Sequence, residues 1–157
     1  MITKTQEALE AAGIDTKKET ETGQLILFSE RTHLINGRFD TDRMIKLVDQ
    51  AIVDALKAGF KGLRGTGDAV WEMGDHLDME KFILYEKKLD KFLVKKKATI
   101  LCQYNLKVVG DQYLHDSLFC HNAVVEEKNV SLDNHFYNSL YDFPQSSFEV
   151  MRNSLRE

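Results

Sequence analysis

Residues 78–104, with the sequence DMEKFILYEKKLDKFLVKKKATILCQY, decide the fold because they join a long amphipathic helix to a buried strand. In residues 78–93 the apolar side chains recur at helical spacing, and they form one stripe made of Met79, Phe82, Tyr85, Leu89, Phe92 and Leu93. Glu86 falls inside this stripe. Residues 98–104 then form an almost unbroken apolar run, which is typical of a strand buried in a parallel sheet.

Helices and strands alternate on both sides of this stretch. Upstream, the patterns predict a helix over residues 5–12, a strand over 24–28, a helix over 40–58 capped by Asp40, and a short strand over 60–64. Downstream, they predict a helix over 111–119, a late strand over 123–125 and a terminal helix over 145–155. Apolar strands separated by long helices predict an α/β fold with a mostly parallel sheet and helices on both faces.

Length and composition indicate one globular domain. The chain has 157 residues, 43% of them hydrophobic, and two cysteines, which excludes a disordered chain, a collagen-like chain and a disulfide scaffold. The net charge of −4 argues against nucleic acid as a partner, and the lysines of residues 87–97 are typical of a solvated helix face. We find no signal peptide and no apolar run long enough to span a membrane, so the predicted location is the cytoplasm.

Polar residues follow the predicted strands at their carboxyl ends, the edge where parallel sheets bind ligands. The strand over 60–64 delivers Arg64 and the Gly65-Thr66-Gly67-Asp68 turn to this edge, and the strand over 98–104 delivers Cys102, Gln103, Tyr104 and Asn105. Ser29 and Glu30 follow the strand over 24–28. These groups predict a binding site at one edge of the sheet.

Several of these residues have two possible roles, one structural and one in ligand binding. The Gly-Thr-Gly turn lacks the spacing of a phosphate loop, which favours a turn that lines a pocket for a ligand without phosphate. Arg64 could form an ion pair or contact a ligand, and Glu86 could pair with Arg64 or line the pocket. Trp71 suits either a pocket wall or the core.

Cysteine and histidine do not signal catalysis or a metal site. Cys102 lies in an apolar strand and reads as a small buried hydrophobe, since no neighbour in the sequence supplies an activating base. Asp111, His115, Asp116, Cys120 and His121 cluster loosely without the ligand spacing of a zinc site. We therefore predict no catalytic residue, no metal and no cofactor.

Taken in order, the edge motifs resemble the MEDS domain, the methanogen/methylotroph sensory domain. The matching elements are Gly-Arg-Phe-Asp at residues 37–40, Gly-Leu-Arg-Gly-Thr-Gly-Asp-Ala-Val-Trp at 62–71, Tyr-Glu at 85–86, Leu-Cys-Gln-Tyr at 101–104, His121 before the late strand, and Asn-His-Phe-Tyr at 134–137. The resemblance covers roughly residues 5–140. Here Asn105 replaces the aspartate that usually follows Cys-Gln-Tyr in the family.

The resemblance implies a RecA/KaiC-like domain without a phosphate-binding loop, spanning residues 1–140, with residues 141–157 as a helical extension. It implies a non-enzymatic sensory domain for a small organic, hydrocarbon-derived molecule. The ligand-binding residues that it implies are Arg64, Thr66, Gly67, Asp68, Trp71, Glu86, Cys102, Gln103, Tyr104 and His121. A non-catalytic interaction subunit and a small-molecule enzyme remain as alternatives.

The family normally begins with a strand–helix unit ahead of the segment that corresponds to residues 5–13. Without that unit the sheet would expose unpaired backbone at its edge, which proteins avoid. We therefore predict a homodimer, or another homo-oligomer, in which a second copy covers the gap. Signalling would then pass through a separate output protein or through assembly.

Overall fold

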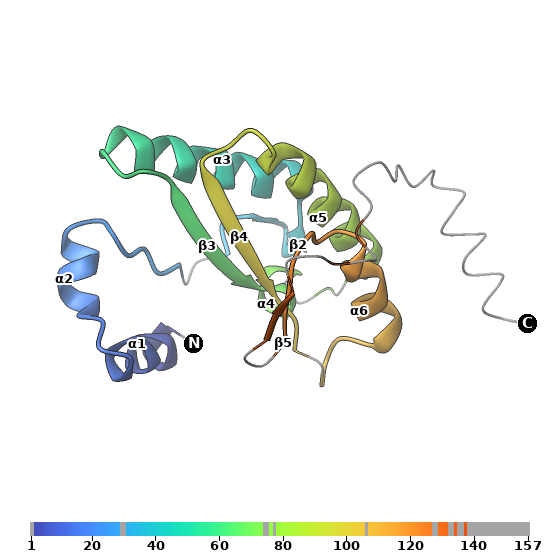
Figure 1. Cartoon of the computed structure of the whole chain (residues 1–157). Helices are drawn as coiled ribbons and strands as arrows, with labels where there is room; N and C mark the ends of the chain where they lie inside the picture. The colour runs from blue at the N-terminus through green and yellow to red at the C-terminus, as the bar shows by residue number, and fades with distance from the viewer. Residues whose placement is uncertain are drawn as a thin grey trace, which may run out of the picture.

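The computed structural model of the chain describes residues 2–28, 31–73, 76, 78–105, 107–126, 129–131, 134 and 137. Within them the fold is mixed α/β (Figure 1). The helices are α1 (Ile2–Ala11), α2 (Thr16–Glu21), α3 (Thr41–Lys57), α4 (Ala69–Met73), α5 (Met79–Leu93) and α6 (Asp111–Leu118). The strands are β1 (Leu34–Ile35), β2 (Arg38–Phe39), β3 (Leu63–Asp68), β4 (Ala98–Gln103), β5 (Val124–Glu126) and β6 (Asn129–Ser131).

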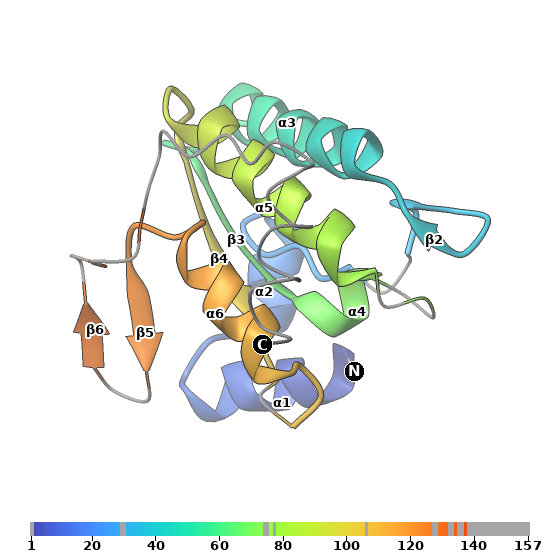
Figure 2. The ribbon, with the colours of Figure 1, turned by 90° about the vertical axis from the view of Figure 1, so that its right-hand side faces the viewer.

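The centre of the fold is the parallel pair β3–β4. Its register runs from Leu63 opposite Ala98 to Asp68 opposite Gln103. Parallel neighbours need a long crossover, and here α4 and α5 supply it. The two other sheets are antiparallel pairs, β1–β2 and β5–β6. Figure 2 shows β5–β6 beside α6 and apart from β1–β2.

The core lies between the helices α3 and α5 and one face of β3–β4, which we call the inner face. Ile100 of β4 and Met44 and Val48 of α3 pack against a buried cluster to which α5 contributes four residues, Phe82, Ile83, Tyr85 and Leu89. At its centre, the Phe39 ring lies 5.3 Å from that of Phe82 and 5.1 Å from that of Tyr85. The apolar stripe of α5 thus faces the core, as its spacing predicted.

Side-chain caps begin both long helices, and the sequence predicted the cap at Asp40. The Arg43 amide donates a hydrogen bond to Asp40 Oδ1 over 2.8 Å at the start of α3. The Lys81 amide donates to Asp78 Oδ1 over 3.1 Å at the start of α5. These bonds satisfy amides that have no partner within the helix. The predictions for α1, α6, β4 and β5 are also confirmed within one to three residues at each end.

The β1–β2 hairpin was not predicted, although its signal is present. Asn36 and Gly37 form the two-residue turn, with φ angles of 51° and 74°. This left-handed backbone is what a tight hairpin turn requires, and Asn-Gly is the pair that adopts it most readily. The hairpin places Phe39 in the core, where it is 2% exposed.

Three predictions about the sheet are wrong. Residues 24–28 are not a strand, because the Leu25 amide bonds to the Glu19 carbonyl at the end of α2. The strand predicted over 60–64 begins at Leu63 and includes Gly65-Thr66-Gly67, which is therefore extended backbone and not a turn. The second face of β3–β4 exposes Thr66, Leu101 and Gln103, so helices do not cover both faces in the described residues.

Two predictions are not tested here. Residues 141–157, and with them the terminal helix predicted over 145–155, lie outside the described residues. The boundary predicted at residue 140 stays a prediction. In the part of the chain that is described, no helix combines the length and the apolar character needed to cross a bilayer.

Candidate functional site

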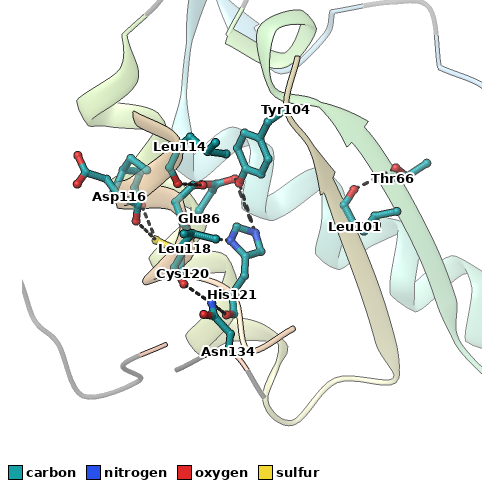
Figure 3. Close-up of polar contacts among 12 residues, drawn as sticks. Thr66, Glu86, Leu101, Tyr104, Leu114, Asp116, Leu118, Cys120, His121 and Asn134 are labelled. Atoms are coloured by element: carbon teal, nitrogen blue, oxygen red, sulfur yellow. Dashed lines mark hydrogen bonds and ion pairs between the residues drawn. The ribbon is translucent and has the colours of Figure 1, made fainter. Parts of the chain in front are cut away.

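Four of the predicted ligand-binding residues meet at the inner face of β4, and three of them are labelled in Figure 3. Glu86 comes from α5, Cys102 lies in β4, Tyr104 follows β4, and His121 follows α6. We call these four residues the polar cluster. Alternation along the strand brings Cys102 and Tyr104 to the same face, while Gln103 between them points to the opposite, exposed face.

Glu86 is the most deeply buried member of the polar cluster, at 2% exposure. The Tyr104 hydroxyl donates a hydrogen bond to Glu86 Oε1. Burial raises the pKa of Glu86 to about 8, and the hydrogen bond from Tyr104 and the nearby Cys102 thiol oppose this rise. Among the described residues, Glu86 Oε2 is buried without a hydrogen-bond partner. At neutral pH the carboxyl group is therefore largely neutral, and in the described structure only one of its two oxygens has a hydrogen-bond partner.

The hydrogen bonds of His121 define its tautomer. Its Nδ1 lies 2.8 Å from the Ser117 carbonyl oxygen, which only accepts, so Nδ1 donates. Burial lowers the pKa of the His121 imidazole, which favours the neutral ring. The lone pair of Nε2 then faces the cluster, 3.4 Å from the Tyr104 hydroxyl and 3.9 Å from Glu86 Oε1.

Cys102 completes the polar cluster with a thiol. Burial raises the pKa of this thiol, and the nearby Glu86 carboxyl raises it further. Cys102 is therefore protonated at neutral pH and is not an activated nucleophile. The other cysteine, Cys120, is buried at 3% exposure, and its thiol lies 3.9 Å from the carbonyl oxygens of Ile83 and Asp116.

A second buried carboxyl group, Glu72 of α4, was missed by the sequence analysis. Burial raises the pKa of Glu72 to about 7, and the nearby Asp68 carboxylate adds to this rise. A Cβ atom on Gly67 would lie 1.7 Å from Glu72 Oε1, so the missing side chain of Gly67 makes room for Glu72. The signal was the alternation of Gly65 and Gly67, which leaves one face of the strand open to a close approach.

The remaining predicted residues do not join the polar cluster. Arg64 is exposed, and Glu86 bonds to Tyr104, so the predicted pair between Arg64 and Glu86 is wrong. Thr66 donates to the Leu101 carbonyl and accepts from the Gln103 side chain, which holds both on the exposed face.

Asp68 and Trp71 are joined by a hydrogen bond at the start of α4. Asp68 Oδ1 accepts a hydrogen bond from the Trp71 amide over 2.8 Å. The Trp71 ring lies 5.3 Å from the ring of His33, whose Nε2 donates to the Glu72 carbonyl over 2.6 Å. His33 is 3% exposed, and burial lowers its pKa. This contact holds the segment before β1 against α4, and nothing in the sequence signals it.

With the geometry established, the comparisons identify the family. Residues 2–122 match the family model described as MEDS, the MEthanogen/methylotroph, DcmR Sensory domain. The chain belongs to the MEDS family. A search of the curated proteins and a search of the solved structures found no match. Membership in a family of sensory domains gives this chain a sensory role in signalling, and the ligand is not specified by it.

The matched region of the MEDS domain contains the whole polar cluster and Glu72. An open cavity of about 460 Å³ lies elsewhere, at the start of α5, where His76, Asp78, Met79 and Glu80 line it. None of the ten predicted ligand-binding residues lines this cavity. The polar cluster is instead closely packed by aromatic rings, with Tyr113 of α6 at 6.0 Å from Tyr104.

Proposed function

We propose that this MEDS domain binds a small organic, hydrocarbon-derived molecule at the polar cluster and acts in signalling without catalysis. The observation that carries the proposal is the unpartnered Oε2 of Glu86, a buried polar atom in a domain whose family is sensory. An unsatisfied buried polar group costs about 1–3 kcal/mol. A ligand that supplies the missing hydrogen bond recovers this free energy.

The surroundings of Glu86 favour a small neutral ligand. The Tyr113 hydroxyl is a second buried group without a hydrogen-bond partner among the described residues, and burial raises its pKa, with the Glu86 carboxyl raising it further. A hydroxyl group both donates and accepts, so one alcohol function could satisfy a carboxyl and a phenol together. The rings of Tyr104 and Tyr113 offer apolar surface to a short hydrocarbon chain.

The ligand-binding residues proposed on this basis are those at the inner face: Gly67, Glu86, Cys102, Tyr104 and His121. Because the ring of Tyr113 packs beside Tyr104 at the polar cluster, we expect binding to move the Tyr104 side chain. Trp71, the only tryptophan of the chain, lies on α4 beside Glu72, where its fluorescence can report such a change.

Short-chain alcohols and amines titrated into the full chain are expected to shift the amide resonances of residues around Glu86 and Tyr104. Glu86→Gln and Tyr104→Phe should each weaken the binding of the best ligand by roughly tenfold, about 1.4 kcal/mol, because each removes one polar partner. Two-dimensional NMR and calorimetry measure these changes.

Glu80→Gln is the matched control, since Glu80 is exposed on the same helix. It should bind as the wild type does. Equal affinity in the wild type and in Glu86→Gln, or shifts confined to the cavity at His76 and Glu80, would place the ligand outside the polar cluster and contradict the proposal.

We further propose that a second copy of the chain covers the exposed apolar segment Leu25-Ile26-Leu27-Phe28, giving a homodimer. Ile26 is 59% exposed and Phe28 is 67% exposed. The described β3–β4 pair has two strands only, so its edges are open to a further strand in the described part of the chain. In this proposal the second copy completes a RecA/KaiC-like sheet. The dimer lies in the cytoplasm and signals through a separate output protein.

Light scattering after gel filtration is expected to give the mass of a dimer for the wild type. Phe28→Asp should lower the mass to that of a monomer, because it places a charge in the apolar contact. Val94→Asp is the control, as Val94 is 74% exposed at the end of α5 and outside the segment. A wild type that stays monomeric at all concentrations would disprove the homodimer.

A further inference from the structure

In the described part of the chain, three possible metal ligands converge in the polar cluster. The carboxylate oxygen of Glu86, the Sγ of Cys102 and a ring nitrogen of His121 all lie within 4.8 Å of one another. In a tetrahedral zinc site with bonds of about 2.0–2.3 Å, ligand atoms lie about 3.3–3.8 Å apart. The 3.9 Å between His121 Nε2 and Glu86 Oε1 is already close to that range.

His121 is oriented as a metal-ligating histidine usually is. Its Nδ1 donates to the Ser117 carbonyl over 2.8 Å, which leaves the lone pair of Nε2 facing Glu86 and Cys102. Protein metal sites use this second hydrogen bond to fix the tautomer and the ring orientation. The arrangement therefore does not depend on a metal being present.

Glu86 supplies an independent sign that a ligand is missing. It is 2% exposed, and its Oε2 has no hydrogen-bond partner in the described part of the chain. A buried carboxyl group needs hydrogen-bond partners, and a cation that displaces its proton satisfies the resulting carboxylate. Among the described residues that surround it, the polar cluster supplies a thiol and an imidazole, and zinc is a cation that cysteine, histidine and glutamate all bind.

We propose that Glu86, Cys102 and His121 bind one Zn²⁺-like divalent cation and leave a fourth coordination position open. A ligand set of one sulfur, one nitrogen and one oxygen suits zinc, and three protein ligands with one open position are typical of zinc sites that bind a further molecule. The dication displaces the protons of the Cys102 thiol and the Glu86 carboxyl group, which are released to solvent, and the resulting site has no net charge. The proposal departs from the sequence prediction of no metal site.

The metal site extends the proposed sensory function. It rests on that function in one respect only, namely that the sensed ligand binds at the open coordination position. Tyr104 lies beside that position, because its hydroxyl contacts both Glu86 and His121. A small alcohol or amine that binds the cation would compete with water there. Metal binding itself does not require that step.

The test is a titration of Co²⁺ into the full chain after treatment with a chelator. We expect one Co²⁺ per chain, a thiolate-to-cobalt charge-transfer band, visible bands typical of a tetrahedral site, and displacement by Zn²⁺. Cys102→Ser should abolish the charge-transfer band, and His121→Gln and Glu86→Gln should each weaken binding at least tenfold.

The chain offers matched controls. Cys120→Ser removes the other thiol, and His115→Gln removes a histidine on α6 that is outside the group. Both should keep the band and the affinity. A band that survives in Cys102→Ser, or that is lost in Cys120→Ser, would overturn the assignment.

X-ray absorption of the zinc-loaded wild type keeps the test decisive if a variant does not fold. We expect one sulfur and two or three nitrogen or oxygen neighbours, whereas a spectrum without sulfur would overturn the site. The alcohol titration, repeated on metal-free and zinc-loaded protein, separates the two proposals. If the protein binds an alcohol but takes up no Co²⁺, the metal site is overturned and the ligand proposal stands. If the protein takes up zinc but binds no alcohol or amine, the ligand proposal is overturned and the metal site stands.

Discussion

Phe82→Ala is expected to lower the free energy of unfolding by about 3–5 kcal/mol. Phe82 is 1% exposed, and its ring lies 5.3 Å from the rings of both Phe39 and Tyr85. Removing it leaves a cavity between α5, β2 and α6, because Tyr113 also contacts this ring at 6.4 Å. Urea unfolding followed by circular dichroism measures the change as a lower midpoint at an unchanged slope.

Phe92→Ala is the matched control. Phe92 lies on the same helix, so the change in helix propensity is the same, but its side chain is only partly buried. We expect a loss of about 1 kcal/mol, in proportion to the smaller apolar area removed from water. Equal losses for both variants would show that Phe82 does not hold the centre of the core.

The second large effect concerns Glu72 and pH. The pKa of its carboxyl group is raised from 4.5 to about 7 in the folded protein, first by burial and then by Asp68. Below pH 4.5 both the folded and the unfolded state are protonated there. Between pH 4.5 and 7 the unfolded state loses the proton while the folded state keeps it, so Glu72 lowers the free energy of unfolding by about 3 kcal/mol.

Glu72→Gln isolates this contribution. The difference in unfolding free energy between this variant and the wild type should change by about 3 kcal/mol from pH 4 to pH 8, in favour of the variant at high pH. In the described part of the chain, the other titratable groups that interact electrostatically with Glu72 are Asp68, Tyr85, Glu86, Cys102 and Tyr113, and His33 bonds to its backbone. They are present in both proteins, so their own titrations largely cancel.

The measurement is a series of urea titrations in buffers that contain a chelator, so that no metal enters the polar cluster. Glu80→Gln, an exposed change on α5, should keep the wild-type pH profile. A Glu72→Gln profile parallel to that of the wild type would show that Glu72 has the same pKa in the folded and the unfolded state, and that burial does not raise it.

The long helices could be predicted from the sequence because their signals are local. The Asp caps of α3 and α5 and the apolar stripe of α5 lie within a few residues of the backbone that they organise. The wrong prediction of a strand over 24–28 has the opposite cause, because the formation of a strand is not decided by local signals. A strand exists only where another strand pairs with it, and nothing within residues 24–28 says whether a partner is present.

The candidate site was only partly predicted, because a sequence motif does not show which face of a strand each side chain occupies. The motif of Cys102, Gln103 and Tyr104 suggested that all three residues line one pocket. A strand turns successive side chains to opposite faces, so Gln103 bonds to Thr66 on the exposed face while its two neighbours face Glu86.

Glu72 and His33 show what the sequence could not reveal. The position of Glu72 depends on the space that Gly67 leaves, and that of His33 depends on a contact across 39 residues. Arg64 seemed to be the partner of Glu86 because a charge near a buried strand needs compensation. The structure resolves this by exposing Arg64 and by giving Glu86 a tyrosine.

The members of the polar cluster lie close together along the chain, and this has a consequence for how the protein folds. The contact from Glu86 to Tyr104 closes a loop of 18 residues, and that from Tyr104 to His121 closes one of 17. Closing a loop of this length loses about 2–3 kcal/mol of chain entropy beyond a constant, which is modest for a tertiary contact. Contacts of short sequence separation form fast. We therefore expect α5, β4 and α6 to assemble early as one local unit, and the link between His33 and Glu72 to close afterwards.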